Sequence, residues 1–328
     1  MTLASAPAST PDLLRLLVVP VFAWAALRDV ATRRVPSSTW IPLGALGAAL
    51  LVWDARAAYA AGGFVWGYDF LVPAAVSLGV VAPLAYLFWW VGGFGGADAK
   101  ALLALALWFP TTPTYAVGPW TLPLSTTPIG AFSLTILTNA VLVGAAVPVA
   151  LAARNAAAGR FSAAMVVGWP VPVERVPDLH GRLLETPDGR TVRGLDLDAL
   201  RMYLRWRGLS LADLRADPDR YRDPATLPAE PNPPTDGAVE ADGLLPDGGA
   251  PAGTDDGAVD DPWGAAAFLD DVDGSAYGTS ADRLRAGLEV LCEEDRVWIS
   301  PGTPFLVPVF GGLLVALVYG DVLVGALP

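Results

Sequence analysis

Long apolar segments with few or no charged residues are the feature of this sequence that most restricts its fold. A helix that spans a bilayer needs about 20 predominantly apolar residues. Three segments reach this length plainly: residues 70–91, 129–153 and 303–327. Three shorter ones accompany them: residues 13–28, 40–53 and 101–109. We therefore predict an all-α polytopic membrane protein with six transmembrane helices.

The first segment resembles a secretory signal peptide in length but lacks the features that flank one. No basic leader precedes it and no small-residue cleavage site follows it. Four charged residues follow instead: Arg28, Asp29, Arg33 and Arg34. We therefore predict a retained transmembrane helix.

Basic residues beside the apolar segments predict which loops face the cytoplasm, because cytoplasmic loops carry an excess of Lys and Arg. They cluster after the first and fifth segments and at the start of the fourth: Arg28, Arg33, Arg34, Lys100, Arg154 and Arg160. The loops on the other side hold Arg56 alone. This bias predicts a cytoplasmic location for residues 28–39, 92–100 and 154–302, with both termini outside.

The long polar region before the last segment has two parts, one with the pattern of a folded domain and one with the composition of a disordered segment. Residues 171–214 contain a strand (VPVERV), a hairpin candidate that turns on Pro187-Asp188-Gly189, and a helix (LDALRMYLRW) that ends at Gly208. Residues 223–280 contain thirteen acids, many Pro and Gly, and no Lys or Arg. A segment of this composition repels itself and buries little apolar surface, so we predict disorder there.

These patterns divide the chain into five parts. Residues 1–153 form a membrane domain with the first five spans. Residues 154–222 form a small α+β cytoplasmic domain, and residues 223–280 an acidic disordered linker. Residues 281–302 form a cytoplasmic helix that leads back to the membrane, and residues 303–328 the last span.

The residue inventory excludes several classes of site. The single cysteine, Cys292, allows no internal disulfide and no cysteine-based metal site. The single histidine, His180, leaves no second imidazole for zinc, and it lies in a turn-like stretch, where it cannot serve a Ser-His-Asp site. The net charge of −12 disfavours nucleic acid. We therefore expect no metal, no cofactor and no nucleic-acid partner.

Acids at membrane borders remain as candidates for chemistry, since ionisable groups there are costly and usually functional or paired. Four acids adjoin apolar segments: Asp29, Asp69, Asp98 and Asp321. Asp69 and Asp321 both fall on the predicted outer side, whereas Asp29 and Asp98 both fall on the predicted cytoplasmic side. Two carboxylates in one site share a proton, so one can activate water while the other donates a hydrogen bond. Alternatively, Asp29 pairs with Arg28 or Arg33, and Asp98 only caps its helix.

Two motifs around these aspartates resemble those of the type IV prepilin peptidases. In RDVATRRVPSS (28–38), Asp29 is followed by Arg33 and a Val-Pro pair that includes Pro36. In GGFGGADAKALL (92–103), the matching residues are Gly95, Gly96, Ala97, Asp98 and Lys100, with Ala97 where many members have Gly. The ending of the chain, residues 296–321, resembles the last span of the archaeal branch.

The resemblance implies a membrane aspartyl endopeptidase with Asp29 and Asp98 as its catalytic residues. Such enzymes remove a short basic leader from prepilin or preflagellin precursors at the cytoplasmic membrane face, immediately before the hydrophobic segment of the precursor. The N-methylating domain and cysteine motifs of bacterial relatives are missing, so we expect no methyltransferase activity.

Two other functions stay open. A presenilin-type protease uses a similar Gly-x-Gly-Asp element to cut inside a transmembrane helix, but the PAL signature of that group is absent. A transporter or assembly scaffold would use its acids to bind ions or protons. Transporters place such residues near the bilayer midplane, whereas Asp29 and Asp98 lie at a border.

Overall fold

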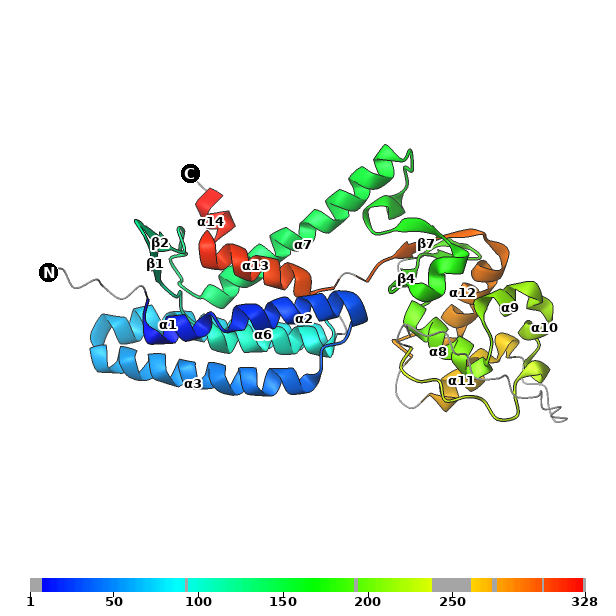
Figure 1. The fold of residues 1–328 in the computed structure, drawn as a ribbon, viewed down its shortest axis with the longest axis horizontal. Helices are drawn as coiled ribbons and strands as arrows, with labels where there is room; N and C mark the ends of the chain where they lie inside the picture. The colour runs from blue at the N-terminus through cyan, green and yellow to red at the C-terminus, as the bar shows by residue number, and fades with distance from the viewer. Residues whose placement is uncertain are drawn as a thin grey trace. The chain divides into compact units, whose positions relative to one another are not determined.

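The computed structural model describes residues 8–91, 94–191, 194–237, 261–272, 276–302 and 304–326. The chain forms two compact units (Figure 1). The helical unit comprises residues 1–147 and 304–328, and the inserted unit comprises residues 148–303. Each unit has its own hydrophobic core.

The helical unit is built from apolar helices and one short hairpin. In chain order these are α1 (Thr10–Arg15), α2 (Val18–Thr32), α3 (Ser37–Ala61), α4 (Val72–Val76), α5 (Ala82–Trp90), α6 (Gly96–Trp108), β1 (Tyr115–Val117), β2 (Trp120–Leu122), α7 (Phe132–Ala157), α13 (Leu306–Val318) and α14 (Val322–Ala326). Helix α7 continues past residue 147 into the inserted unit.

One continuous helical stretch runs from Val65 to Trp90 and contains two π-helical segments. These segments are η1 (Val65–Leu71) and η2 (Ser77–Val81). Each is followed at once by a helix with a proline in its first two residues. Proline has no N–H to donate to the preceding turn, and widened π turns accommodate that missing hydrogen bond.

Among the described residues, three helices are long and apolar enough to cross a membrane: Ser37–Ala61, Val65–Trp90 and Phe132–Ala157. The first of these extends well beyond the predicted segment 40–53. The other three predicted spans form shorter helices, since α2 has 15 residues and α6 and α13 have 13 each. The protein therefore has the helices of a membrane protein, while the count of six spans stays a prediction.

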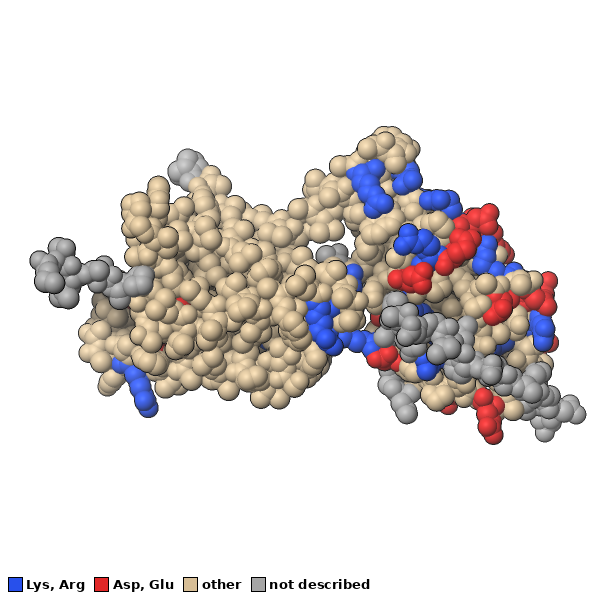
Figure 2. Space-filling view, in the orientation of Figure 1, with Lys and Arg blue, Asp and Glu red and all other residues tan. Residues whose placement is uncertain are grey.

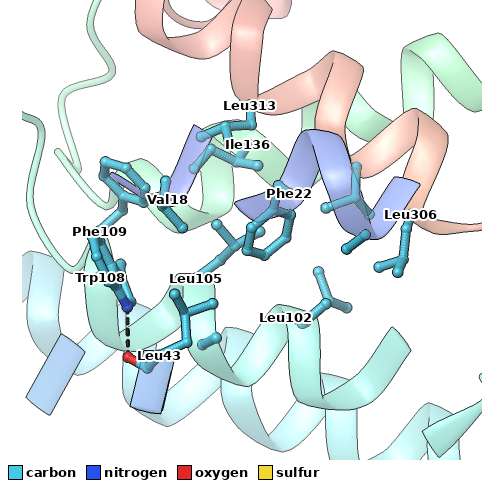
Figure 3. Close-up of a cluster of buried hydrophobic side chains, with 14 of the residues drawn as sticks. Val18, Phe22, Leu43, Leu102, Leu105, Trp108, Phe109, Ile136, Leu306 and Leu313 are labelled. Carbon is cyan, nitrogen blue, oxygen red and sulfur yellow. Dashed lines mark hydrogen bonds between the residues drawn. The ribbon is translucent and has the colours of Figure 1, made fainter. Parts of the chain in front are cut away.

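The core of the helical unit surrounds α6, whose residues are buried on most sides. Apolar side chains of α2, α7 and α13 meet those of α6 in one cluster (Figure 3). Trp108 donates its indole N–H to the carbonyl of Leu43 at 2.8 Å. A Cβ at Gly47 would lie 2.6 Å from the Trp108 ring, so α3 approaches α6 closely only because this residue is glycine.

The inserted unit is a small α+β fold, as predicted. A three-stranded antiparallel sheet has the order β3 (Trp169–Pro172), β7 (Arg296–Ser300), β4 (Arg182–Leu183). The predicted hairpin forms from β5 (Glu185–Thr186) and β6 (Gly189–Arg190). The helices are α8 (Leu197–Arg207), α9 (Leu211–Ala216), α10 (Pro218–Arg222), α11 (Ala265–Asp271) and α12 (Ala281–Glu293). Gly208 ends α8 in the left-handed region, as predicted.

Two predicted boundaries inside this unit are wrong. Strand β7 lies in the middle of the sheet, so residues 281–302 belong to the inserted unit and are not only a connection to the membrane. Residues 261–272 are not disordered, because Trp263 and Phe268 are fully buried in the core. Tyr203 donates its hydroxyl to the carbonyl of Trp263 at 2.6 Å. The middle of the predicted linker, residues 238–260, lies outside the described residues.

The two units differ in how many charged side chains their surfaces carry. Acidic and basic side chains gather on the surface of the inserted unit, whereas the visible surface of the helical unit consists mostly of other residue types (Figure 2). Exposed large apolar side chains are frequent on α3, α5 and α7. Such a surface is suited to lipid, because only an apolar solvent leaves it without a hydration penalty.

Candidate active site

Asp29 lies in the last turn of α2 and is buried, with 8 % of its surface exposed. The helix ends three residues later, because Arg33 adopts a left-handed conformation (φ 55°) and its N–H donates to the carbonyl of Asp29 at 3.0 Å. One carboxylate oxygen, Oδ2, accepts a hydrogen bond of 3.2 Å from the backbone N–H of Leu306. Asp29 therefore joins α2 to the start of α13.

Asp98 is the third residue of α6, where a carboxylate can accept backbone N–H groups that the helix itself leaves unpaired. Its Oδ2 accepts a 3.0 Å hydrogen bond from the N–H of Gly95, the residue that caps the helix. A Cβ at position 95 would lie 3.1 Å from this oxygen, which is closer than almost all real contacts. Glycine at this position therefore lets the carboxylate reach the backbone.

The charges of Asp29 and Arg33 both act on Asp98, and the charge of Arg33 also acts on Asp29. The structure thus brings together the two aspartates that the sequence singles out. It also brings Arg33 to them. We call Asp29, Asp98 and Leu306 the Asp29 end of the helical unit.

The other motif residues shape the surroundings of this end. Lys100 donates to the hydroxyl of Ser37 at 2.7 Å and so links α6 to α3. Pro36 is the residue before α3 and has extended backbone angles. Gly96 is the first residue of α6, and Ala97 packs partly buried against the core. Gly92 and Gly93 lie outside the described residues.

A second carboxylate pair lies at the other end of α2 and α6, and sequence reasoning missed it. Arg15 is 2 % exposed, and its guanidinium binds the carboxylates of Asp12 and Asp54 and the carbonyl of Trp108. We call these four residues the Arg15 end. The signal was present, since Arg15 lies inside an apolar segment and Asp54 directly follows one.

The two other border acids have different surroundings. Asp69 is exposed on the helical stretch after α3. Asp321 is buried at 4 % exposure, and its carboxylate accepts hydrogen bonds from the N–H of Val324 and the hydroxyl of Thr138. Asp321 therefore has a structural role between α7 and α14, and a substitution there would not be neutral.

The single histidine is half-buried in the inserted unit. Its Nδ1 lies 3.2 Å from the carboxylate of Asp198, which also binds Arg201. Within the described part of the chain, no cluster of three or more His, Cys, Asp or Glu side chains is arranged to hold a metal ion.

Comparison with known families gives two matches. The model of the Type IV leader peptidase family matches residues 16–149, which include both aspartates of the Asp29 end. The model of the archaeal peptidase A24 C-terminus, type II, matches residues 271–322, which run from the end of α11 to the start of α14. No curated protein matches the chain.

The apolar helices and the first match define the class of this protein, a peptidase of the membrane. More particularly, the two matches together cover more than half of the chain and occur in the order expected of one protein. The chain belongs to the type IV leader peptidase family, in its archaeal prepilin and preflagellin peptidase branch.

Proposed function

We propose that this protein is an aspartyl endopeptidase that removes the short basic leader from prepilin or preflagellin precursors at the cytoplasmic membrane face. The observation that carries the proposal is the meeting of Asp29 and Asp98. They come from different helices and lie 69 positions apart in the chain, yet Leu306 binds Asp29 while the adjacent Phe305 packs on Phe94, next to the residue that binds Asp98.

The chemistry follows from two carboxylates that share one proton. The ionised carboxylate takes a proton from a water molecule, and the resulting nucleophile attacks the carbonyl carbon of the scissile amide. The protonated carboxylate donates a hydrogen bond to the carbonyl oxygen, on which negative charge develops. A proton then passes to the departing amide nitrogen, the C–N bond breaks, and the pair returns to its starting state.

The sidedness of the site supports this choice of substrate. The positive-inside rule assigns the Asp29 end to the cytoplasm together with the inserted unit. A precursor whose basic leader remains in the cytoplasm and whose hydrophobic segment enters the bilayer places its scissile bond at that same face. Both termini of the peptidase then lie outside.

Digestion of purified precursors by the purified protein in detergent tests the proposal. We expect one cut immediately before the hydrophobic segment, and loss of that cut with Asp29→Asn or Asp98→Asn. Asp69→Asn is the matched control, because it removes an exposed border charge away from both carboxylates. A cut inside the hydrophobic segment would instead indicate a presenilin-type protease. Normal cleavage by either dyad variant would overturn the aspartyl mechanism.

A further inference from the structure

The first turn of α13 contacts both halves of the Asp29 end. Leu306 is the first residue of this helix and donates its N–H to Asp29. Phe305, one residue earlier, packs its ring against Phe94, with ring centroids 4.5 Å apart and an interplanar angle of 40°. Phe94 directly precedes Gly95, whose N–H holds Asp98. The N-cap residue and the first residue of α13 therefore contact the two segments that carry the carboxylates.

The hydrogen bond to Asp29 uses a donor that the helix cannot satisfy itself. The first four N–H groups of an α-helix have no partner within the helix. The N–H of Val307 donates to Pro304 and that of Val309 donates to Phe305, whereas the N–H of Leu306 donates to Oδ2 of Asp29. The positive end of the helix dipole points the same way and favours a carboxylate there. This contact fixes one oxygen of Asp29 in space.

The contact between the rings of Phe305 and Phe94 restrains the segment that holds Asp98. Phe94 stacks on Phe88 of α5 as well, with centroids 4.9 Å apart. The rings of Phe88, Phe94 and Phe305 thus form a row from α5 to α13. The Phe94–Gly95 peptide carries the N–H that holds Asp98, so packing of the Phe94 ring restrains the segment from which that N–H comes. The row therefore links the position of Asp98 to the position of α13.

We infer that the turn Phe305–Leu306 is a positioning element of the active site, which sets the separation of the two carboxylates. Neither residue touches the scissile bond in this account. Leu306 acts through its backbone N–H on Asp29, and Phe305 acts through Phe94 on the loop that holds Asp98. The inference rests on the proposed function, because it assigns a role within the same aspartyl site.

A pair of matched phenylalanines gives a sharp test. Phe109 and Phe132 also pack ring to ring in the same core, with centroids 5.4 Å apart, and they lie beside Trp108 at the Arg15 end. We expect Phe305→Ala to lower kcat for precursor cleavage by about 10–100-fold, the loss typical of misplacing reacting groups by about 1 Å. KM should change little, and the pH profile of kcat should shift because the coupling between the carboxylates changes. Phe305→Tyr keeps the aromatic ring and should retain most of the parent kcat.

The control variant Phe132→Ala removes more buried ring surface, since Phe132 is 1 % exposed. It should lower thermal stability while leaving kcat of the folded enzyme and its pH profile near those of the parent. Equal loss of kcat in Phe305→Ala and Phe132→Ala, or a normal kcat in folded Phe305→Ala, would overturn the inference. Normal cleavage by Asp29→Asn in the same assay would overturn the proposed aspartyl function itself. Loss of cleavage in Asp29→Asn with normal kcat in Phe305→Ala would overturn only the positioning role.

The hydrogen bond can be tested separately by replacing one peptide bond with an ester. Incorporating the α-hydroxy analogue of leucine at position 306 removes the N–H that Asp29 accepts and keeps the side chain. The hydroxy analogue of valine at position 307 removes an N–H of the same turn that bonds to a carbonyl. We expect a larger fall in kcat and a shifted pH profile for the ester at 306. Equal behaviour of the two esters would refute the positioning role of Leu306.

Discussion

The helical unit holds a pair of carboxylates at each end, and the two pairs are bound in different ways. At the Arg15 end, one buried guanidinium donates hydrogen bonds to Asp12 and to Asp54. At the Asp29 end, each carboxylate accepts a hydrogen bond from a backbone N–H, and the charge of Arg33 acts on both. The two pairs come from different helices, since Asp29 and Asp98 lie on α2 and α6, whereas Asp12 lies on α1 and Asp54 on α3.

The difference fits the proposal that one carboxylate pair is structural and the other catalytic. A carboxylate pair that binds a buried arginine depends on that cation, because losing it leaves buried polar groups and charge that nothing compensates. Two carboxylates in one site can share a proton, because ionising both there is costly, and the charge of Arg33 near the Asp29 end partly offsets that cost. The same residue type therefore stabilises the fold at one end and is available for acid–base chemistry at the other.

The largest effect expected from this comparison is on catalysis. Asp29→Asn and Asp98→Asn should each lower the cleavage rate by at least about 10²–10⁴-fold, because Asn cannot accept and release the proton. The double variant should lose little more, since either loss disables the same unit. Asp54→Asn should retain the kcat of the parent in its folded fraction. Precursor cleavage at matched amounts of folded enzyme measures these rates. Loss of cleavage in folded Asp54→Asn would contradict the distinction between the Arg15 end and the Asp29 end.

The next effect is on stability. Arg15→Met should destabilise the helical unit by about 3–5 kcal/mol, because it removes one partner of a buried ion pair. A fall in the thermal unfolding midpoint in detergent would report it. Arg56→Met is the control, because Arg56 is an exposed arginine on the same side of the unit as Asp54. An unchanged midpoint for Arg15→Met would show that the Arg15 end contributes nothing to the fold.

A third test concerns the sides of the membrane on which the two ends lie. Single cysteines can be introduced by Ser38→Cys and Thr121→Cys, and both positions are exposed. Ser38 is near the Asp29 end, and Thr121 is on the hairpin whose Tyr115 donates a hydrogen bond to Asp12. An impermeant thiol reagent should label position 121 in intact cells and position 38 only after permeabilisation. Burial raises the pKa of the native Cys292 thiol to about 11, so its reaction at neutral pH should be slow. Labelling of position 38 from outside would contradict the topology.

The smallest effect is expected from the acidic stretch of the inserted unit. Deleting residues 240–258 should change the unfolding midpoint and kcat little, because this composition buries little apolar surface. Trp263→Ala, a few residues later, should cost about 3–5 kcal/mol, because it empties a fully buried site. Thermal unfolding of both variants measures the contrast. Equal destabilisation by the deletion and by Trp263→Ala would show that the acidic stretch packs on the core of the inserted unit.

Sequence predicted most of the helices because apolar runs and cap residues are local signals. The extent of α3 was underestimated because Asp54 and Arg56 interrupt the apolar run. Arg15 binds Asp54, so the helix continues past a charge that hydropathy treats as an end. Residues 261–272 were misjudged for a related reason: the average composition of a long acidic stretch hid two aromatic residues that are fully buried.

The candidate site was predictable only in part. The border positions and the topology pointed to Asp29 and Asp98, because those signals lie within short motifs. The N–H of Leu306 could not be predicted, since it comes from 277 positions further along the chain and any residue but proline offers the same group. The contact between Phe94 and Phe305 likewise depends on packing that no local pattern records.

The distance along the chain between Asp29 and its donor has a consequence for biosynthesis. Asp29 leaves the ribosome early, whereas Leu306 follows 277 residues later. At about 5–20 residues per second, the carboxylate waits roughly 15–55 s for the N–H that holds it. The strand that completes the sheet of the inserted unit, β7, is made just before that helix. The nascent chain therefore acquires the hydrogen bond that holds Asp29 only after the inserted unit has been made.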